Sequence, residues 1–263
     1  MGELTGKVAL ITGASRGLGR YLARRLGAEG CHLVICSRNE AEIKATRDEV
    51  QRRTGAKVVA IRADVTCEED VGNMAATAVQ EFATIDLLVC NAGLVGSATS
   101  IHNFDLASWK QIVEVNLYGY FLCVREVSRV MIEHGGGAIV QINSRSGKRG
   151  TAKNSAYAAS KGGGIVLTQS LSAELAAHNI RVNCICVGSL FESDLWQDFL
   201  FDDYAKRYGM TPEQVKEKYL EAIPLKRGCE YEDVGNLVVF LLSDKSSYMT
   251  GQAVNLTGGE VVW

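Results

Sequence analysis

The sequence predicts an α/β fold in which a doubly wound parallel sheet of seven strands carries helices on both faces. Short β-branched runs alternate with helical patterns from one end of the 263 residues to the other. This alternation is typical of a parallel sheet with crossover helices, and the almost continuously apolar runs indicate strands covered on both faces. The strands are expected at residues 7–12, 32–36, 57–61, 86–90, 138–142, 181–186 and 253–256.

The composition is that of a globular protein, with 47% hydrophobic and 22% charged residues and a net charge of −2. The chain is too apolar to be disordered, and no stretch approaches the roughly 20 apolar residues of a bilayer span. Its first residues, MGELTGKVALITG, lack the pattern of a secretory signal. The near-neutral charge provides no basic field for nucleic acid. We therefore expect a single cytoplasmic domain over residues 1–263, with neither membrane nor nucleic-acid partners.

The eight cysteines raise the question of a disulfide framework, because their number is even. They are scattered along the chain, form no C-x-x-C pair, and lie in part in apolar runs such as HLVIC and LLVC. Cysteine in such runs behaves as a small hydrophobic residue. Reduced core thiols are therefore predicted, and the scattered cysteines and histidines indicate no metal site.

A glycine-rich turn follows the first strand and opens a helix that is expected to run to about residue 29. Its glycines have the spacing G-x-x-x-G-x-G. Such glycines let the backbone turn tightly and approach a pyrophosphate at the positive end of the helix dipole, or they serve only to pack the helix on the strand. The first reading predicts a Rossmann-type dinucleotide site containing Gly13, Ser15, Arg16, Gly17, Leu18 and Gly19.

The end of the second strand indicates which dinucleotide is bound. This strand ends in Cys36-Ser37-Arg38 and lacks the acid that would hold the ribose 2′-hydroxyl of NAD. Arg38 and Arg16 are suited to bidentate contacts with a 2′-phosphate. NADP(H) is therefore favoured, and NAD(H) is the alternative if Arg38 is only a solvated loop charge. The next two strand ends complete the expected cofactor site with Asp64, Val65, Asn91, Ala92 and Gly93.

Four polar residues form a candidate catalytic group. Asn116 lies within a long amphipathic helix that starts near residue 105, where an amide must be hydrogen-bonded to be buried cheaply. Ser144 follows the fifth strand, and Tyr157 and Lys161 are four residues apart on one face of a helix that runs to about residue 178. Each residue alone has a structural explanation, but all four are expected at the carboxyl side of one sheet.

These residues resemble the short-chain dehydrogenase/reductase family over nearly the whole chain. The match comprises the three glycines, the Asn-Ala-Gly segment, the tetrad and the Ser-to-Tyr spacing of 13 residues (157 − 144). The resemblance implies that Tyr157 exchanges the alcohol proton, Ser144 holds the substrate oxygen, Lys161 holds the nicotinamide ribose and lowers the pKa of Tyr157, and Asn116 anchors a relay water.

One segment departs from the family pattern. The family usually has Pro-Gly after the sixth strand and then a threonine, whereas this chain reads Val187-Gly188-Ser189-Leu190-Phe191-Glu192-Ser193. The backbone at Val187 and Gly188 is expected to meet the nicotinamide carboxamide. Ser189 and Ser193 are the candidate side chains that assist it.

The segment 189–228 is interpreted as a helical substrate lid over the carboxyl edge of the sheet. It contains both prolines of the chain and many aromatic and charged residues that look exposed. In doubly wound sheets this edge binds the ligands. The alternative is a longer helical connection without a role in binding.

The carboxyl half resembles the polyol-phosphate branch of the family, whose members interconvert sorbitol 6-phosphate and fructose 6-phosphate. The resemblance rests on the segments IVQINSRSGKRG, KNSAYAASKGG, IPLKRG and MTGQAVNLTGGEVVW. A phosphorylated substrate needs cationic donors. The candidates for this role are Arg145, Lys148, Arg149 and Lys153, with Lys226 and Arg227 at the end of the lid; the alternative is that they are solvated loop charges.

Two other functions stay open at this point. One is a 3-oxoacyl-thioester reductase, which would use the same loop charges to dock an acyl carrier. The other is a non-catalytic regulator that senses NADP(H). Family resemblance further implies a homodimer or homotetramer through the helices near 105–133 and 154–178, with the apolar tail Val261-Val262-Trp263 at an interface.

Overall fold

Seven parallel strands form one sheet in the order β3-β2-β1-β4-β5-β6-β7, as the computed structural model of residues 2–263 shows. Each expected strand is present and the predicted fold class is confirmed. The strand order reverses between β1 and β4, which is where doubly wound sheets bind ligands. The strands are β1 (Val8–Thr12), β2 (His32–Ser37), β3 (Val58–Arg62), β4 (Leu87–Cys90), β5 (Gly137–Ser144), β6 (Ile180–Val187) and β7 (Ala253–Leu256).

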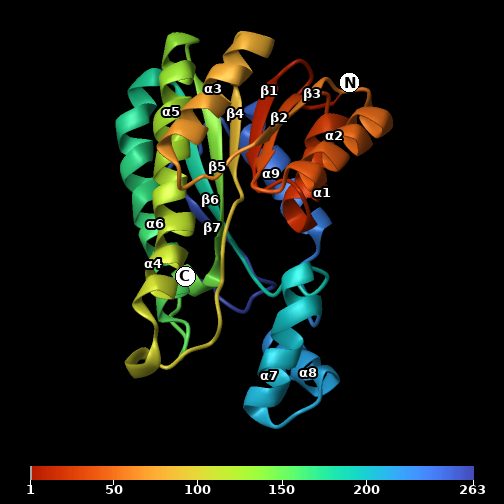
Figure 1. Ribbon diagram of the computed structural model, residues 1–263, viewed down its shortest axis with the longest axis vertical. Helices are drawn as coiled ribbons and strands as arrows, with labels where there is room; N and C mark the ends of the chain where they lie inside the picture. Colours follow the sequence, from red (N-terminus) through yellow and green to blue (C-terminus); the bar gives the residue numbers. More distant parts are fainter. Residues whose placement is uncertain (1) are drawn as a thin grey trace.

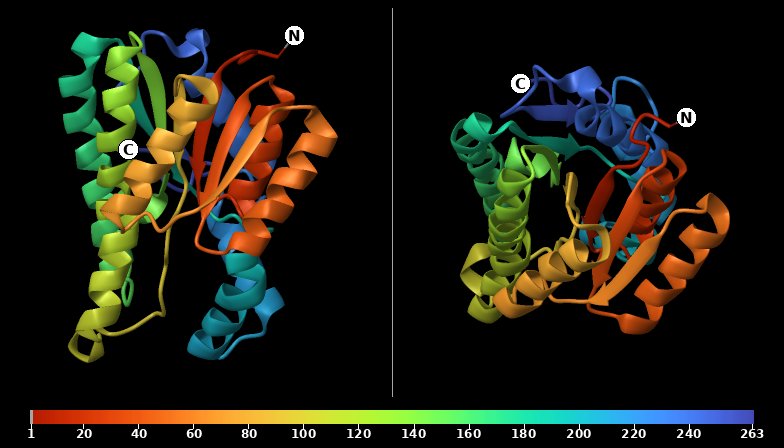
Figure 2. Two further views of the ribbon diagram at one scale, coloured as in Figure 1. Left: turned by 45° about the horizontal axis from the view of Figure 1, so that its top comes forward. Right: turned by 90° about the horizontal axis from the view of Figure 1, so that it is seen from above.

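Helices cover both faces of this sheet (Figures 1 and 2). One apolar cluster lies between the sheet and helices α1 (Gly17–Ala28), α2 (Glu40–Thr54) and α9 (Tyr231–Leu242). The other lies beneath α3 (Glu68–Phe82), α5 (Gly119–Glu133) and α6 (Ser155–Leu175). Because both faces are packed, substrates and cofactors must bind at the edges of the sheet, and the carboxyl ends of all strands meet at one of them.

The long helix expected from residue 105 is interrupted where Asn116 lies. Helix α4 (Leu106–Val113) passes through the π-helical segment Glu114–Tyr118 into α5. Single π-turns of this kind are frequent at functional sites, because the extra residue shifts the side chains that follow it. The interruption turns the Asn116 side chain toward the loop that follows β4, where it bonds Leu94.

The segment 189–228 folds as helices beyond the carboxyl edge of the sheet, below it in Figure 1. It contains the π-helical segment Trp196–Leu200, α7 (Phe201–Tyr208) and α8 (Pro212–Ala222), and α8 begins with a capping box between Thr211 and Gln214. Most of the aromatic residues that look exposed in the sequence are instead packed together, whereas Phe199 and Tyr208 are exposed. Trp196 is 6% exposed and Phe201 is 8% exposed in a small core of their own. The expected exposure of Trp196 and Phe201 was therefore wrong, because the segment packs on itself; a role as a substrate lid stays a prediction.

All eight cysteines are free, as predicted, and six of them are buried. Cys36, Cys184 and Cys186 lie on strands, where each fills a core position. Within residues 2–263, the structure contains no helix long and apolar enough to cross a bilayer.

Candidate active site

The glycine turn is held against the end of β4 by a set of hydrogen bonds. The Asn91 side chain donates to the carbonyl oxygens of Thr12 and Gly13, both at 3.0 Å. The Thr12 hydroxyl accepts from the backbone N–H groups of Asn91 and Ala92, both at 3.1 Å. Gly13 has φ +65°, and a Cβ there would lie 2.9 Å from the Cα of Ala92. Only glycine permits this contact between the two loops.

Gly19→Ala is expected to destabilise the fold and to weaken dinucleotide binding. A Cβ at Gly19 would lie 2.1 Å from the carbonyl oxygen of Gly13, which is backbone and cannot move aside cheaply. The free energy of unfolding should fall by about 2 kcal/mol or more, as for overpacking of a core position. Thermal unfolding and a fluorescence titration with NADPH measure both effects. Gly72→Ala is the control, because a Cβ there meets nothing within 4 Å; equal behaviour of the two variants would contradict the prediction.

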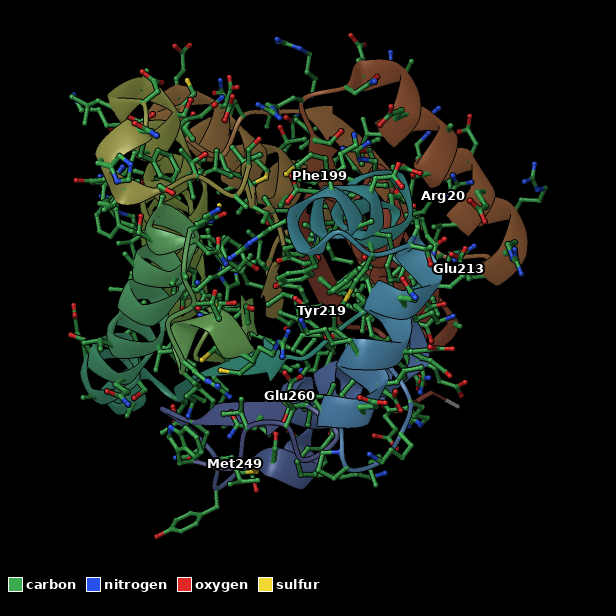
Figure 3. The ribbon with its side chains drawn as sticks, turned by 90° about the horizontal axis from the view of Figure 1, so that it is seen from below. Arg20, Phe199, Glu213, Tyr219, Met249 and Glu260 are labelled. Carbon is green, nitrogen blue, oxygen red and sulfur yellow. The ribbon has the colours of Figure 1, made fainter. Side chains whose placement is uncertain are left out.

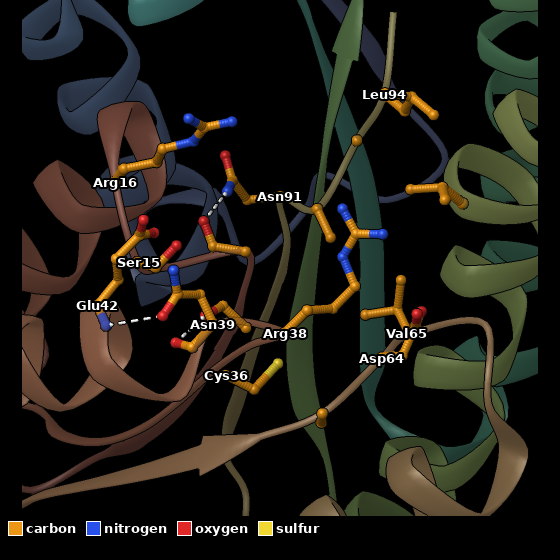
Figure 4. Close-up of a pocket in the computed structure, with 16 residues that line it drawn as sticks. Ser15, Arg16, Cys36, Arg38, Asn39, Glu42, Asp64, Val65, Asn91 and Leu94 are labelled. Carbon is orange, nitrogen blue, oxygen red and sulfur yellow. Dashed lines mark hydrogen bonds between the residues drawn. The ribbon is translucent and has the colours of Figure 1, made fainter.

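A cavity of about 420 Å³ lies at the reversal of strand order, between the glycine turn and the ends of β2, β3 and β4 (Figure 4). Ten of the predicted cofactor residues line it: Gly13, Ser15, Arg16, Ser37, Arg38, Asp64, Val65, Asn91, Ala92 and Gly93. Sequence reasoning missed six others: Cys36, Asn39, Glu42, Ala63, Leu94 and Val115. Gly17 and Gly19 lie in the turn but do not line this cavity, and Leu18, Val187 and Gly188 line the neighbouring one.

Charges of both signs face the cofactor cavity. The Arg38 side chain extends across it toward Asp64 and Val65, and Arg16 lies at the glycine turn (Figure 4). Glu42 lies in the first turn of α2, and its carboxylate lies beside Ser15 (Figure 4). The side chain of Asn39, the N-cap of α2, accepts a hydrogen bond from the Glu42 N–H at 3.2 Å. Sequence reasoning did not identify Glu42, because its place in the cavity depends on how α2 packs beside the glycine turn.

Ser144 and Tyr157 lie together in a second cavity of about 220 Å³. Ser144 ends β5, where it pairs with Val187 of β6, and Tyr157 lies in the first turn of α6. Burial raises the pKa of the Tyr157 hydroxyl, and the neighbouring Ser144 hydroxyl and Arg145 guanidinium oppose that rise. Tyr157 therefore holds its proton at neutral pH in the absence of other ligands.

Lys161 lies one turn after Tyr157 on α6. Its Nζ is 5.7 Å from the centroid of the Tyr157 ring and donates to the carbonyl of Ile142 at 2.9 Å. The residue is 5% exposed, and no carboxylate among residues 2–263 forms an ion pair with it. Burial lowers the pKa of Lys161 to about 8, and the nearby cysteine thiols oppose this fall. The Lys161 ammonium therefore destabilises the fold when it is charged, and it can stabilise an anion placed beside it.

The Asn116 side chain connects the π-helical segment to the loop after β4 and to α6. Its Oδ1 accepts from the Leu94 N–H at 2.7 Å, and its Nδ2 donates to the Leu94 carbonyl at 2.8 Å and to the Ser160 hydroxyl at 3.0 Å. Both amide hydrogens are thus used within the protein. A relay water at Asn116 stays a prediction, and it would need the remaining oxygen lone pair or a backbone group.

The second cavity, at the mouth of the tetrad, is lined by aliphatic, aromatic and polar side chains. Trp196 and Tyr204 of the segment 189–228 contribute to its walls, and sequence reasoning did not identify them. Ser189 and Ser193 line it as well. Ser193 donates to the Leu190 carbonyl at 2.7 Å, whereas the buried Ser189 hydroxyl has no partner within residues 2–263. This hydroxyl is therefore free to bond a group bound in the cavity.

Of the four cationic residues predicted to bind substrate, the structure brings only Arg145 to this cavity. Lys148, Arg149 and Lys153 do not line it, and the latter two are exposed. Lys226 and Arg227 are also outside it. Lys226 donates to the Glu221 carbonyl, and Arg227 forms a bidentate pair with Asp233 that fixes the start of α9.

Comparison with known proteins assigns the chain to a family. A family model described as short chain dehydrogenase matches residues 7–200. The chain belongs to the short-chain dehydrogenase family. Members of this family are oxidoreductases that act on alcohols or ketones with a nicotinamide cofactor, so the chain is an enzyme of that kind.

Several family members resemble the chain over almost their whole length. Sorbitol-6-phosphate 2-dehydrogenase of Escherichia coli (strain K12) is 40% identical, and the match covers 98% of this chain and 99% of that protein. A 3-oxoacyl-(acyl-carrier-protein) reductase of Aquifex aeolicus is 33% identical, with 98% of each chain covered. The crystal structure of sorbitol-6-phosphate 2-dehydrogenase from Erwinia amylovora is 41% identical, covers 97% of this chain and 100% of its own, and has a TM-score of 0.94.

Proposed function

We propose that this short-chain dehydrogenase interconverts a secondary alcohol of an open-chain polyol, or of its phosphate, and the corresponding ketose. The observation that carries the proposal is the cavity that Ser144 and Tyr157 share with the polar groups of Ser146, Asn154 and Tyr204, although aliphatic side chains such as Leu190 and Leu195 complete its walls. These polar groups suit a ligand rich in hydroxyls. The similarity to sorbitol-6-phosphate 2-dehydrogenases makes sorbitol 6-phosphate and fructose 6-phosphate the first couple to test.

In the proposed mechanism a bound nicotinamide would supply or accept the hydride, and residues of this chain bind the reacting oxygen and transfer its proton. Ser144 donates a hydrogen bond to the carbonyl oxygen, and Tyr157 gives that oxygen a proton as the carbonyl becomes an alcohol. Lys161 stabilises the tyrosinate that remains. In the oxidative direction, the Tyr157 anion removes the proton of the alcohol.

The residues present fit a nicotinamide dinucleotide. The glycine turn would receive the pyrophosphate at the N-terminus of α1. The unpartnered hydroxyl of Ser189, beside Val187 and Gly188, is suited to the carboxamide. Ser37, Arg38 and Arg16 favour the 2′-phosphate of NADP(H), whereas Glu42 in the same cavity opposes it. NADP(H) is the cofactor we propose, and NAD(H), bound in a related xylitol dehydrogenase structure, is the alternative.

Arg38→Ala is expected to raise the dissociation constant of NADPH at least about tenfold and that of NADH less than about threefold. The reason is that Arg38 supplies charged hydrogen bonds to the 2′-phosphate, each contributing about 1.5–3 kcal/mol. Fluorescence titrations with both cofactors measure the two constants. Arg52→Ala is the control, because Arg52 is an exposed residue in the last turn of α2, at the opposite end of the helix from the cofactor cavity. Equal losses for NADPH and NADH would refute the assignment.

A screen of nicotinamide absorbance tests the proposed function directly. Both cofactors are combined with polyols, polyol phosphates and an acetoacetyl thioester. The thioester represents the second candidate function, 3-oxoacyl reduction, which the 33–36% identical reductases of that activity favour. Turnover of the polyol class supports the proposal, and turnover of the thioester alone would replace it.

We also propose that the enzyme is a homodimer or homotetramer. Exposed apolar side chains lie along the two helical regions expected to pair, at Leu106, Tyr118 and Val166, which are 64%, 59% and 64% exposed. In the tail, Val261 is buried in its own chain, whereas Val262 and Trp263 are exposed. Apolar surface of this kind is typical of an interface. Analytical ultracentrifugation measures the oligomeric state.

A further inference from the structure

A partly buried ion pair joins the loop after β5 to the C-terminal segment. Arg145 directly follows Ser144, and its guanidinium pairs with the carboxylate of Glu260 in the segment 257–263. The two side chains are 22% and 11% exposed. Sequence reasoning expected Arg145 as a cation for the substrate and did not identify Glu260, because nothing in the sequence shows that the end of the chain returns to this loop.

Further contacts fix both partners. The Arg145 guanidinium lies 5.6 Å from the centroid of the Tyr219 ring of α8. Thr257 and Val261 exchange two hydrogen bonds, at 2.9 and 3.2 Å, which close the turn that presents Glu260. Figure 3, which shows the molecule from below, labels Tyr219 and, beneath it, Glu260. The pair joins the loop after β5 to the C-terminal segment, and Arg145 also contacts α8 through Tyr219.

Among residues 2–263, Arg145 carries the only charge among the side chains that line the second cavity, where Ser144 and Tyr157 lie. Its pairing with Glu260 cancels most of that charge. The second carboxylate oxygen of Glu260 is buried without any hydrogen-bond partner among residues 2–263, so no other donor neutralises it. A phosphate brought to Arg145 would have to displace this carboxylate or share the guanidinium with it, and like charges at short distance are destabilising.

We infer that Glu260 is a specificity-determining residue, whose pairing with Arg145 makes the cavity favour an uncharged polyol over the phosphate of the same polyol. An uncharged hydroxyl accepts a hydrogen bond from a remaining N–H of the guanidinium without separating the pair, because arginine has five such donors. This inference rests on the proposed function, and it names which members of the proposed substrate class the site accepts best.

The test compares kcat/KM for sorbitol and sorbitol 6-phosphate in wild type and in Glu260→Gln. The glutamine keeps the shape of the side chain and releases the charge of Arg145. The ratio of phosphate to neutral kcat/KM should rise at least about tenfold, the factor for one gained charge-assisted hydrogen bond. In the double variant Glu260→Gln/Arg145→Gln the ratio should fall back, because the cation is then absent. Glu217→Gln, an exposed carboxylate of α8, is the control and should leave the ratio unchanged.

Several outcomes would overturn the inference. These are an unchanged or lower ratio in Glu260→Gln, a gain that persists in the double variant, and a wild-type preference for the phosphate. Glu260→Ala removes the carboxylate without an isosteric replacement and should move the ratio in the same direction, so the test does not depend on one variant. Wild-type enzyme that turns over neither form of the polyol would instead refute the proposed function.

Discussion

Tyr157→Phe is expected to lower kcat by about 10³-fold while leaving the dissociation constant of NADPH within about twofold. The substitution removes one hydroxyl from the second cavity, where Tyr157 lies with Ser144. General acid–base catalysis by a positioned side chain contributes about 10²–10⁴-fold to a rate. The ring and its packing stay, so neither the fold nor the cofactor cavity should change. Steady-state kinetics with the substrate found in the screen and a fluorescence titration measure the two quantities.

Tyr208→Phe is the matched control, because Tyr208 of α7 does not line the second cavity. It should retain wild-type kcat. A Tyr157→Phe variant with near-normal turnover would contradict the acid–base role of Tyr157. If wild type itself turned over no carbonyl or alcohol while binding NADPH normally, a cofactor-sensing role would become the better explanation.

The sheet could be predicted almost completely because its strands are short apolar runs, and the central ones, such as β1 and β4, are buried along their whole length. For instance, the run from 181 to 186 appears as β6, Ile180–Val187, with only the ends extended. The break in the helix at Asn116 was not predicted. A π-turn depends on the bonds that Asn116 makes to Leu94 and Ser160, and these residues are distant in sequence.

The positions of the candidate site residues were predictable to the extent that they follow strand ends or share a helix face. Ser144 ends a strand, and Tyr157 and Lys161 are separated by one helical turn, so local geometry brings them to the same edge. Trp196 and Glu260 could not be identified in this way. The packing of the aromatic core within residues 189–228 and the return of the C-terminal segment to the loop after Ser144 place them, and both are tertiary contacts.

The loop cations show why charge in a sequence does not locate a substrate site. Lys148 and Arg149 are within five residues of Ser144, yet the short 3₁₀ turn at Arg145–Gly147 directs only Arg145 to the cavity. Arg145 is in turn occupied by Glu260. A count of basic residues near a catalytic motif therefore overestimates the positive charge that a substrate meets.

Lys161→Met is expected to lower kcat at least about 100-fold and to stabilise the free protein at pH 7. Lys161 is buried without a carboxylate partner, and burial lowers its pKa to about 8 from an ordinary value near 10.5. Below pH 8 both the folded and unfolded states hold the proton, so the folded state bears the full cost of the buried charge. Between pH 8 and about 10.5 the unfolded state binds more protons, and the stability of wild type therefore rises with pH.

The methionine removes the cost of the buried charge, which is about 3 kcal/mol of unfolding free energy for a pKa shift of this size. It also leaves the Ile142 carbonyl without its hydrogen-bond donor, and this loss offsets about 1 kcal/mol of the gain. The melting temperature should thus rise by roughly 4–8 °C at pH 7.

The difference in melting temperature between Lys161→Met and wild type should shrink as the pH rises from 8 toward 10.5, and calorimetry at pH 7 and 9.5 measures it. Lys110→Met, an exposed lysine of α4, should show no such pH dependence. A gap that is constant with pH, or a less stable variant, would contradict the buried charge as its cause. Loss of activity together with gained stability is what a residue kept for catalysis at the expense of the fold produces.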